Sequence, residues 1–351
     1  FPFLSKSVKS DFITIPPAAQ RAGAGLTYTR KSLIIVSTDS GGIDVKFGVI
    51  IVTYNRLALL RECLMNVFSQ TVPFHRILVV DNHSTDGTAQ YLDSLEYPEL
   101  TVLHLPENIG GAGGFARGLK EIAAGDCDWV LIIDDDAMIE SRYMEEIQHA
   151  ITGNRYLAYS GTVKTGGVID TSHRRLLTNR CLMFYTPVPE TAYENETFLY
   201  DVSTFCGLVL KVSLIRKIGL PKAKYFIWFD DTEYCLRFRK YTRILNVCNA
   251  ELDHRTAPPE KAPAVSWKNF YGFRNAIDIG LTYSSCPAAY LAYIRLNHLA
   301  HIAIDGLLSL FGSKKAERRY RMKIYRDVLL GIGKKPGGMD RRYPPGSGFQ
   351  N

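Results

Sequence analysis

The chain has 351 residues, of which 46% are hydrophobic and 22% are charged, as in a globular protein of one large domain or two smaller ones. It has no apolar run of about 18 residues or more, so the sequence predicts no membrane-spanning helix. The seven cysteines form no CxxC pair and are odd in number, which favours reduced thiols over a disulfide framework.

Positive charge is concentrated towards the C-terminal end. Residues 288–351 contain twelve Lys or Arg and four acids, a net charge of +8, while the whole chain carries +7. A basic end on a nearly neutral body predicts an anionic surface as a partner.

Predicted strands and helices alternate in the first half of the chain. Residues 1–46 are an N-terminal extension with one short run, Leu33–Val36, that suits a strand. Strands are then expected at 47–53, 76–80, 101–105 and 129–133, and helices at about 57–70, 88–95 and 115–124. This alternation predicts an α/β fold with a doubly wound, mostly parallel sheet.

The second half of the chain is less regular. A strand and a helix are expected around Gly207–Ile218, and another strand at Ile244–Val247. The residues from Pro287 onward have a helical pattern. Arg295, His298, His301 and Asp305 share one face of that helix, which we interpret as a polar stripe.

Three consecutive aspartates, Asp134–Asp136, end the apolar run Trp129–Ile133. Adjacent carboxylates repel one another unless a cation lies among them. Alternate residues of an extended strand point the same way, so Asp134 and Asp136 can face one ligand while Asp135 faces elsewhere. Carboxylates suit Mg²⁺ or Mn²⁺, often bridging to a phosphate. The alternative is a solvated acidic turn that caps the next helix.

Polar residues follow the other predicted strands as well. Thr53–Asn55 close the first strand, Asp81 closes the second, and Asn108 follows the third. These groups meet at one edge of a parallel sheet, where a nucleotide can bind, although each alone also suits a helix cap or turn.

The glycine-rich segment Asn108–Ala116 contains a G-x-G-x-x-A string between a strand and a helix. The string resembles a dinucleotide-binding fingerprint, but that fingerprint belongs to the first strand-helix turn of its fold, and two such units precede this one. We therefore expect Gly110 and Gly111 to let the backbone approach a ligand closely.

A second acidic cluster, Asp230–Glu233, follows the aromatic run Phe226–Phe229. Carboxylates desolvated by aromatic rings can act as a base, whereas acids at a helix start are also favoured by the helix dipole. His254 follows the predicted strand 244–247. It is either a structural histidine or an imidazole ligand beside the carboxylates.

The chain resembles an inverting, metal-dependent family 2 glycosyltransferase with the GT-A fold, over about residues 47–280. The resemblance rests on Val52–Arg56, Val80–Asn82, Asp134–Asp136 and Asp230–Glu233. More narrowly, the chain is similar to bacterial galactofuranosyltransferases. That likeness rests on Asn108–Gly118, Phe226–Arg237 and Trp267–Asn275.

The resemblance implies a role for each motif. Asp134, Asp136 and His254 would hold Mn²⁺ or Mg²⁺ on the donor diphosphate, and Asp231 would be the catalytic base. The predicted donor-binding residues are Thr53, Tyr54, Asn55, Asp81, Asn108, Gly110, Gly111 and Asp135, with Asp81 at the uracil. The predicted acceptor-binding residues are Trp228, Asp230, Glu233 and Arg274.

The expected reaction is transfer of galactofuranose from UDP-galactofuranose to a lipid-linked cell-surface glycan. The alternatives are a dTDP-rhamnose transferase, an NAD-dependent oxidoreductase built on the glycine loop, and a non-catalytic nucleotide-sugar-binding subunit. We expect an extension at 1–46, a catalytic domain at 47–280 (nucleotide part 47–137, acceptor part 138–280) and a basic helical region at 281–351. The expected location is cytoplasmic, with residues 288–342 at the inner face of the plasma membrane. An oligomer is compatible with the sequence, and no nucleic-acid partner is expected.

Overall fold

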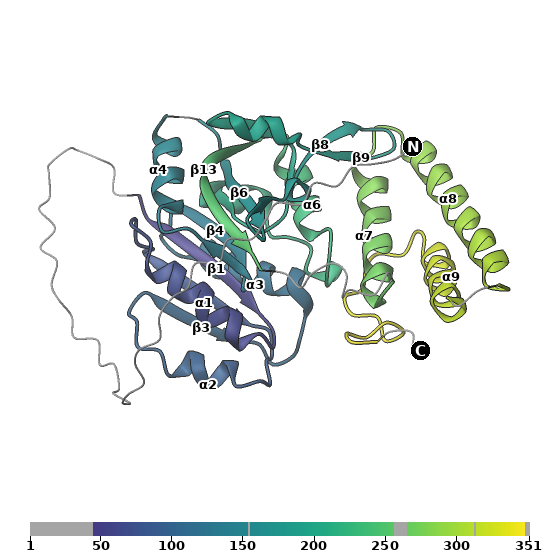
Figure 1. Cartoon of the computed structure of the whole chain (residues 1–351), viewed down its shortest axis with the longest axis horizontal. Helices are drawn as coiled ribbons and strands as arrows, with labels where there is room; N and C mark the ends of the chain where they lie inside the picture. Colours follow the sequence, from purple (N-terminus) through teal and green to yellow (C-terminus); the bar gives the residue numbers. More distant parts are fainter. Residues whose placement is uncertain (1–44, 154, 256–264, 312–313, 348–351) are drawn as a thin grey trace, which may run out of the picture. The chain divides into compact units, whose positions relative to one another are not determined.

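The computed structural model describes residues 45–153, 155–255, 265–311 and 314–347 (Figure 1). They belong to one compact unit that begins at Asp44. The predicted strand Leu33–Val36 lies outside the described residues.

A mixed sheet forms the centre of this unit. Its strands are β1 (Phe47–Thr53), β2 (Arg76–Asp81), β3 (Leu100–His104), β4 (Trp129–Asp134), β5 (Ala137–Ile139), β6 (Ala158–Thr165), β7 (Val168–Ile169), β10 (Thr197–Tyr200), β12 (Leu208–Lys211) and β13 (Ile244–His254). The order is β10-β13-β6-β12-β4-β1-β2-β3, with β5 paired to β13 and β7 to β6. The strands β4, β1, β2 and β3 are parallel, and so are β6 and β13, while β12 runs antiparallel between β4 and β6. The predicted mostly parallel sheet is therefore confirmed.

Helices cover both faces of the sheet. They are α1 (Leu57–Phe68), α2 (Thr88–Asp93), α3 (Gly110–Ala124), α4 (Tyr143–Gly153), α5 (Val212–Ile218) and α6 (Asp230–Phe238), with short 3₁₀ turns at η1 (Thr171–His173), η2 (Glu190–Glu194) and η3 (Ala223–Tyr225). Alternate residues of β1 enter two separate cores. Val49 and Ile51 pack with α1 and α4, whereas Ile50 and Val52 pack with α3. Strand periodicity thus places a buried layer on each side of the parallel strands.

Helix α3 begins five residues earlier than predicted. We expected a glycine loop up to Gly114 and a helix from Phe115, but Gly110–Gly114 form the first turns of α3. A Cβ at Gly114 would lie 2.7 Å from Val52 Cγ1, and one at Gly118 would lie 2.6 Å from Ile50 Cγ2. The glycines therefore serve close packing of α3 on β1, which outweighs their low helix propensity.

A second, three-stranded sheet has the order β11-β8-β9, formed by β8 (Arg174–Asn179), β9 (Phe184–Pro187) and β11 (Val202–Ser203). The chain then forms α7 (Trp267–Tyr283), α8 (Pro287–Leu308) and α9 (Lys315–Leu330), which lie side by side (Figure 1). A third core joins α7 and α9 to Phe226 and Tyr343. The expected helical C-terminal region is confirmed.

The polar stripe predicted on α8 is only partly exposed. His298 and Asp305 are 3% and 2% exposed, and they face α9, where Arg321 pairs with Asp305 and the ring of Tyr325 contacts His298. The apolar face of α8 is turned outward instead. Among the described residues, no helix is both long and apolar enough to cross a membrane.

Candidate functional site

Polar residues at the ends of β1, β2 and β4 gather around one cavity of about 230 Å³. This arrangement follows from the sheet, because neighbouring parallel strands end at the same edge. The lining includes Thr53, Tyr54, Asn82, Asn108, Gly110, Gly111, Asp134 and Asp135, together with Arg56 and Lys268. The sequence therefore predicted correctly that these strand ends meet.

A second cavity of about 300 Å³ adjoins the first, and both are lined by Arg56, Gly111, Asp134 and Ile227. Its own lining includes Asp136, His173, Cys206, Trp228, Asp230, Asp231 and His254. Asp134 and Asp136 thus share this cavity, whereas Asp135 lines only the first. The two acidic clusters are about a hundred residues apart in the chain, and both contribute carboxylates to the lining of this cavity.

The triplet is held by residues from the end of β1 and the start of α1. The Thr53 hydroxyl donates to Asp135 Oδ2 at 2.7 Å. Arg56 Nη1 donates to Asp135 Oδ1 at 3.1 Å and to Asp136 Oδ2 at 2.6 Å. Asp136 Oδ1 is buried without a hydrogen-bond partner, although His254 Nε2 lies 3.3 Å away within ion-pair distance.

The electrostatics of the triplet suit a divalent cation. Burial and repulsion from Asp136 and Asp135 raise the pKa of Asp134 to about 7, and burial raises that of Asp135 to about 6. Burial also opposes ionisation of Asp136, but His254 and Arg56 outweigh it and lower its pKa. A cation would relieve the repulsion and would give the orphaned Asp136 oxygen a partner. The donor set, two carboxylates and an imidazole, fits Mn²⁺ or Mg²⁺.

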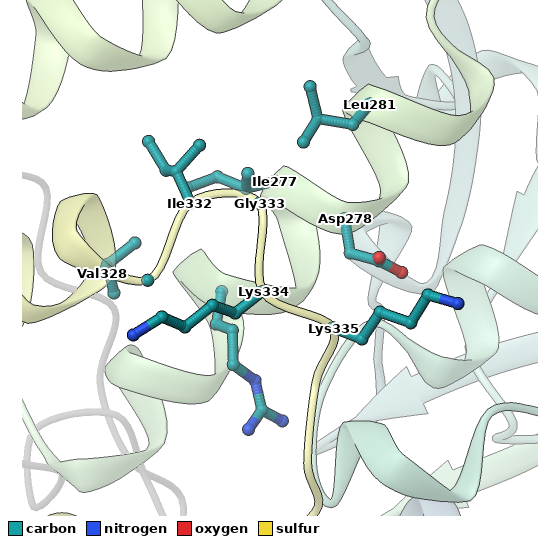
Figure 2. A pocket seen from close by; sticks show the side chains of 10 residues that line it. Ile277, Asp278, Leu281, Val328, Ile332, Gly333, Lys334 and Lys335 are labelled. Carbon is teal, nitrogen blue, oxygen red and sulfur yellow. The ribbon is translucent and has the colours of Figure 1, made fainter.

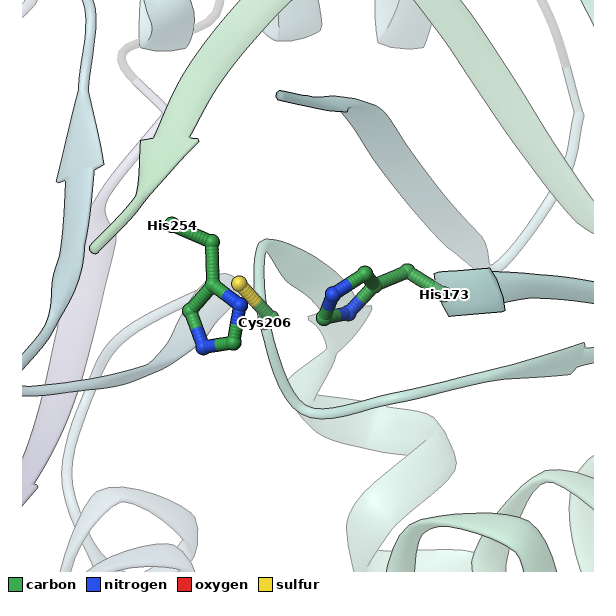
Figure 3. Close-up of side chains that lie close together, drawn as sticks. All are labelled: His173, Cys206 and His254. Carbon is green, nitrogen blue, oxygen red and sulfur yellow. The ribbon is translucent and has the colours of Figure 1, made fainter. Parts of the chain in front are cut away.

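His254 also belongs to a second group of possible metal ligands. One ligand atom from each of His173, Cys206 and His254 lies within 4.8 Å of the others, and the two imidazoles meet edge to face (Figure 3). However, His173 Nδ1 already bonds the Thr204 hydroxyl at 2.7 Å, and the buried Arg174 cation donates to the Cys206 carbonyl. We interpret this group as packing that orients His254 towards Asp136.

The acidic cluster at the start of α6 separates its carboxylates. Asp231 lines the 300 Å³ cavity, and its Oδ1 accepts hydrogen bonds from the amide and hydroxyl of Thr232. Asp230 is 7% exposed, and burial together with the charge of Asp231 raises its pKa well above the ordinary value. Two neighbouring carboxylates in different environments are typical of sites of acid-base chemistry.

The loop before α6 has an unusual backbone. Phe226, Trp228 and Phe229 have φ values of 69°, 63° and 69°, which L-residues rarely adopt. The buried Asn275 side chain holds this loop, because its Nδ2 contacts the carbonyls of Ile227 and Trp228 at 3.0 and 2.9 Å. In this loop Trp228 is 43% exposed and lines the cavity. Residues with strained backbone angles often lie at functional sites.

Two predicted donor residues do not line either cavity. Asp81 is buried, and its carboxylate accepts from the Ser84 amide and bonds His104 Nδ1, both at 2.9 Å. Asn55 accepts from the Thr85 amide at 2.7 Å and fixes the turn after β2. Their predicted donor contacts therefore have no support from the cavity lining, although Asn82, next to Asp81, does line it.

Two predicted acceptor residues also lie outside the cavities with the aspartates. Glu233 is 1% exposed and is bound by Arg237 and by the Tyr283 hydroxyl at 2.6 Å. Arg274 donates to the carbonyls of Tyr225 and Gly338 and lines a separate basic pocket of about 90 Å³ with Lys334 and Lys335 (Figure 2). Both side chains therefore hold neighbouring elements together. Glu233 does not reach the cavity because helical spacing turns it away from Asp231.

Several lining residues were missed by the sequence analysis. Arg56 stands in the quoted Val52–Arg56 motif, which was a usable signal. Asn82 bonds Asn108 through Nδ2 at 3.0 Å and the Ile109 amide through Oδ1 at 3.0 Å, so it shapes the segment that leads into α3. Lys268 likewise stands in the quoted segment Trp267–Asn275. His173 carries no local pattern that marks it as a cavity residue, and only tertiary packing brings it there.

Comparison with known proteins agrees with this geometry. Residues 48–214 match the family described as "Glycosyl transferase family 2". Galactofuranosyltransferase GlfT1 of Mycolicibacterium smegmatis is 36% identical over 189 residues, a match that covers 52% of this chain and 62% of that protein. This chain thus spans about three fifths of the length of that relative.

Solved glycosyltransferases share the fold. The structure of GalNAc-T7 with UDP, GalNAc and Mn²⁺ superposes with a TM-score of 0.58 at 11% identity, covering 82% of this chain and 56% of that one. S. aureus TarS 1-349 in complex with UDP-GlcNAc gives 0.53 at 18% identity, covering 82% of each chain. The central sheet and its helices therefore form a GT-A fold, and residues 48–214 within it match the family 2 glycosyl transferases.

Proposed function

We propose that the protein is an inverting, metal-dependent galactofuranosyltransferase that extends a lipid-linked cell-surface glycan from UDP-galactofuranose. The observation that carries the proposal is the meeting of Asp134 and Asp136 with Asp231 in one cavity. A cation site on the donor side and a carboxylate on the acceptor side are the parts that a direct displacement requires.

The proposed mechanism assigns separate tasks to the two cavities. The 230 Å³ cavity would hold the nucleotide, with the Asn108–Gly111 backbone and Lys268 near its diphosphate. Asp231 would remove the acceptor hydroxyl proton while that oxygen attacks the anomeric carbon. The exposed Trp228 would stack on the acceptor sugar. Asp230, whose pKa is raised by burial, would be the poorer candidate for the base.

Asp134, Asp136 and His254 would hold the metal ion. When bound, Mn²⁺ or Mg²⁺ supplies positive charge that stabilises the leaving diphosphate. Arg56 bridges Asp135 and Asp136 from the other side, and it would keep both carboxylates ionised and oriented. Asp135, bound to Thr53, would act as a support for the site.

The choice of galactofuranose rests on likeness to galactofuranosyltransferases. The geometry favours a nucleotide diphosphate and a metal, and does not separate a five-membered from a six-membered sugar ring. A dTDP-rhamnose donor is therefore the nearest alternative. A nicotinamide cofactor is disfavoured, since Gly110–Gly114 pack α3 against β1 and the loop before α6.

A donor panel tests the proposal directly. Release of UDP or dTDP would be measured with UDP-galactofuranose, UDP-galactopyranose, UDP-glucose and dTDP-rhamnose, each with a lipid-linked acceptor and Mn²⁺. We expect turnover with UDP-galactofuranose, and loss of turnover in EDTA. A preference for dTDP-rhamnose would replace the sugar assignment. Turnover of no donor, together with tight NAD(H) binding, would overturn the proposed function.

The outward face of α8 supports attachment to a membrane surface. Its exposed apolar side chains recur at helical spacing and are between 42% and 70% exposed: Leu296, Leu299, Ile304, Leu307 and Leu308. Leu310 and Phe311, just after the helix, are exposed as well. Exposed cations follow on and before α9: Lys314, Lys315, Arg319, Lys323 and Arg326. An apolar helix face next to cations suits an anionic bilayer, where a lipid-linked acceptor would lie.

A mostly apolar cavity of about 210 Å³ lies between this helix and the site. Phe184, Phe229, Tyr290 and Tyr293 are among its lining residues, and Phe229 directly follows Trp228. Most of this lining is apolar, which favours the hydrocarbon part of an acceptor. This cavity is further support for a lipid-linked substrate.

Vesicle sedimentation tests the attachment. We expect binding to vesicles with anionic phospholipids, weakening with salt, and little binding to neutral vesicles. Leu307→Glu should reduce binding, whereas Met65→Glu, a matched change at an exposed residue of α1, should not. Equal binding of both variants would exclude the α8 face. A dimer in solution that Leu307→Glu dissociates would identify a second copy as the partner.

A further inference from the structure

We infer that Arg175 is a positioning residue that acts on Asp231 through the Thr232 hydroxyl. The inference rests on the proposed function, because it concerns the carboxylate proposed as the base. Arg175 Nη2 donates to Thr232 Oγ1 at 3.0 Å, and Thr232 Oγ1 donates to Asp231 Oδ1 at 2.9 Å. The three groups come from β8 and α6, more than fifty residues apart.

The direction of the chain of hydrogen bonds is fixed by chemistry. A guanidinium has only donors, so Thr232 Oγ1 must accept from Arg175. The single hydroxyl proton is then free for Asp231, whose Oδ1 also accepts from the Thr232 amide. Both bonds fall on the same oxygen. Among the described residues no group donates to Oδ2, which is left for a substrate proton in the cavity that Asp231 lines.

The backbone of Arg175 is paired with strands on both sides. It lies on the middle strand of the three-stranded sheet, where it is in register with Val202 on β11 and Pro187 on β9. Its neighbour Arg174 points into the core and donates to backbone carbonyls, so strand alternation turns Arg175 towards α6. The anchor of the relay is therefore rigid.

The charge of Arg175 has no local structural counterpart. Within the described ranges, no carboxylate lies at ion-pair distance from its guanidinium, and its Nε is buried without a partner. Tyr185, whose ring centroid lies 5.8 Å from the guanidinium carbon, offers only a π face. A half-buried cation without a carboxylate is costly, and the hydrogen bond from Arg175 to the Thr232 hydroxyl offsets part of that cost.

The relay explains why one of two adjacent aspartates suits the role of base. Asp230 is buried and its pKa is raised, whereas Asp231 has one oxygen fixed by Thr232 and the other towards the cavity. Loss of the relay would remove one of the two hydrogen bonds to Oδ1 and leave the Thr232 amide to hold the carboxylate, which could then rotate more easily about its side-chain bonds. Misplacement of a reacting group by about 1 Å can cost around 100-fold in rate.

The test compares turnover of Arg175→Met, Thr232→Val and the double variant with the wild-type enzyme, using the donor and acceptor that the wild type turns over. We expect each single variant to lower kcat by about 10- to 100-fold, with acceptor KM and UDP affinity little changed. The double variant should be no worse than the single ones, since all three interrupt one unit. Thr232→Ser keeps the hydroxyl and should retain near wild-type kcat.

Arg216→Met is the matched control, because Arg216 donates to the carbonyls of Ala123 and Gly125 far from the cavity and should leave kcat unchanged. Thermal unfolding of each variant separates misfolding from loss of the relay. Wild-type kcat in Thr232→Val, additive losses in the double variant, or a higher acceptor KM at unchanged kcat would each overturn the inference. A wild-type enzyme that turns over no donor would instead overturn the proposed function, and the relay with it.

Discussion

The triplet at the end of β4 and the acidic cluster at the start of α6 differ in where the fold places their carboxylates. In the triplet, every carboxylate lines a cavity, and Arg56 and His254 approach from two sides. In the α6 cluster, Asp231 and the buried Asp230, whose pKa is raised, line one cavity, whereas Glu233 lies outside it and is bound by Arg237. The difference arises because a helix turns each residue by about 100°, whereas a strand end keeps alternate residues on one side.

This contrast indicates that equal local acidity does not mean equal function. We expect loss of a triplet carboxylate to remove a binding site and loss of Asp231 to remove a chemical step. Loss of Glu233 should mainly affect stability. Four substitutions and one control substitution test that ranking.

Asp136→Ala should have the largest effect. It removes a proposed metal ligand and the partner of both Arg56 and His254, so transfer activity should be abolished together with Mn²⁺-strengthened UDP binding. Calorimetry of UDP with and without Mn²⁺ measures the second effect. If Mn²⁺ still strengthened UDP binding in the folded variant, the assignment of Asp136 as a metal ligand would be wrong.

Asp231→Asn should keep donor binding but lower turnover by about 10²- to 10⁴-fold, the usual contribution of a general base. Asp230→Asn is its control. Because burial raises the pKa of Asp230 and disfavours its charged form, an amide of the same shape should change turnover much less. Steady-state kinetics of both variants decide the point, and near-normal turnover in Asp231→Asn would transfer the role to another carboxylate.

Asp134→Asn should stabilise the metal-free protein at alkaline pH. The pKa of Asp134 is raised to about 7, from about 3.9 in an unfolded chain, so the folded state binds more protons between those values. Stability therefore falls as pH rises through this range, and asparagine escapes that loss, by at most a few kcal/mol at pH 8. Thermal unfolding in EDTA at about pH 4 and 8 measures the difference.

In the same experiment, Mn²⁺ should raise the unfolding temperature of the wild type and have little effect on Asp134→Asn, because a ligand stabilises the state that binds it. An equal response of both proteins to Mn²⁺ would place the ion elsewhere. A variant that is less stable than the wild type at both pH values would contradict the electrostatic argument.

Glu233→Gln should have the smallest effect on turnover. The substitution weakens the contacts with Arg237 and Tyr283 and leaves an arginine with a neutral partner, at a cost of about 1–3 kcal/mol in stability. kcat should stay within a few-fold of the wild-type value. A drop in kcat without a loss of unfolding temperature would restore Glu233 as an acceptor residue.

The sequence predicted the catalytic half of the fold more closely than the region that follows it. Strands 47–53 and 76–80 were placed within a residue or so, since both are buried on two faces and read as apolar runs. The start of α3 was wrong by five residues. Glycine content indicated a loop, whereas contact with Val52 and Ile50 requires a helix without side chains.

The domain limits near residues 46 and 280 stay predictions, as do the assigned roles of the site residues. Within the described part of the chain, the elements before and after residue 280 share a core, in which Phe226 packs with Tyr271, Ile324 and Tyr343. Sequence patterns could not indicate that sharing, because it depends on side chains that are far apart in the chain.

The sequence by itself determined the sheet edge and the acidic triplet, because strand periodicity and the rule that parallel strands end together are local consequences of residue order. The tertiary structure decided which carboxylates face the cavity, the inward polar face of α8 and the link from Arg175 to Asp231. These features depend on which elements pack against each other, and packing is set by side-chain volume and burial across the whole chain.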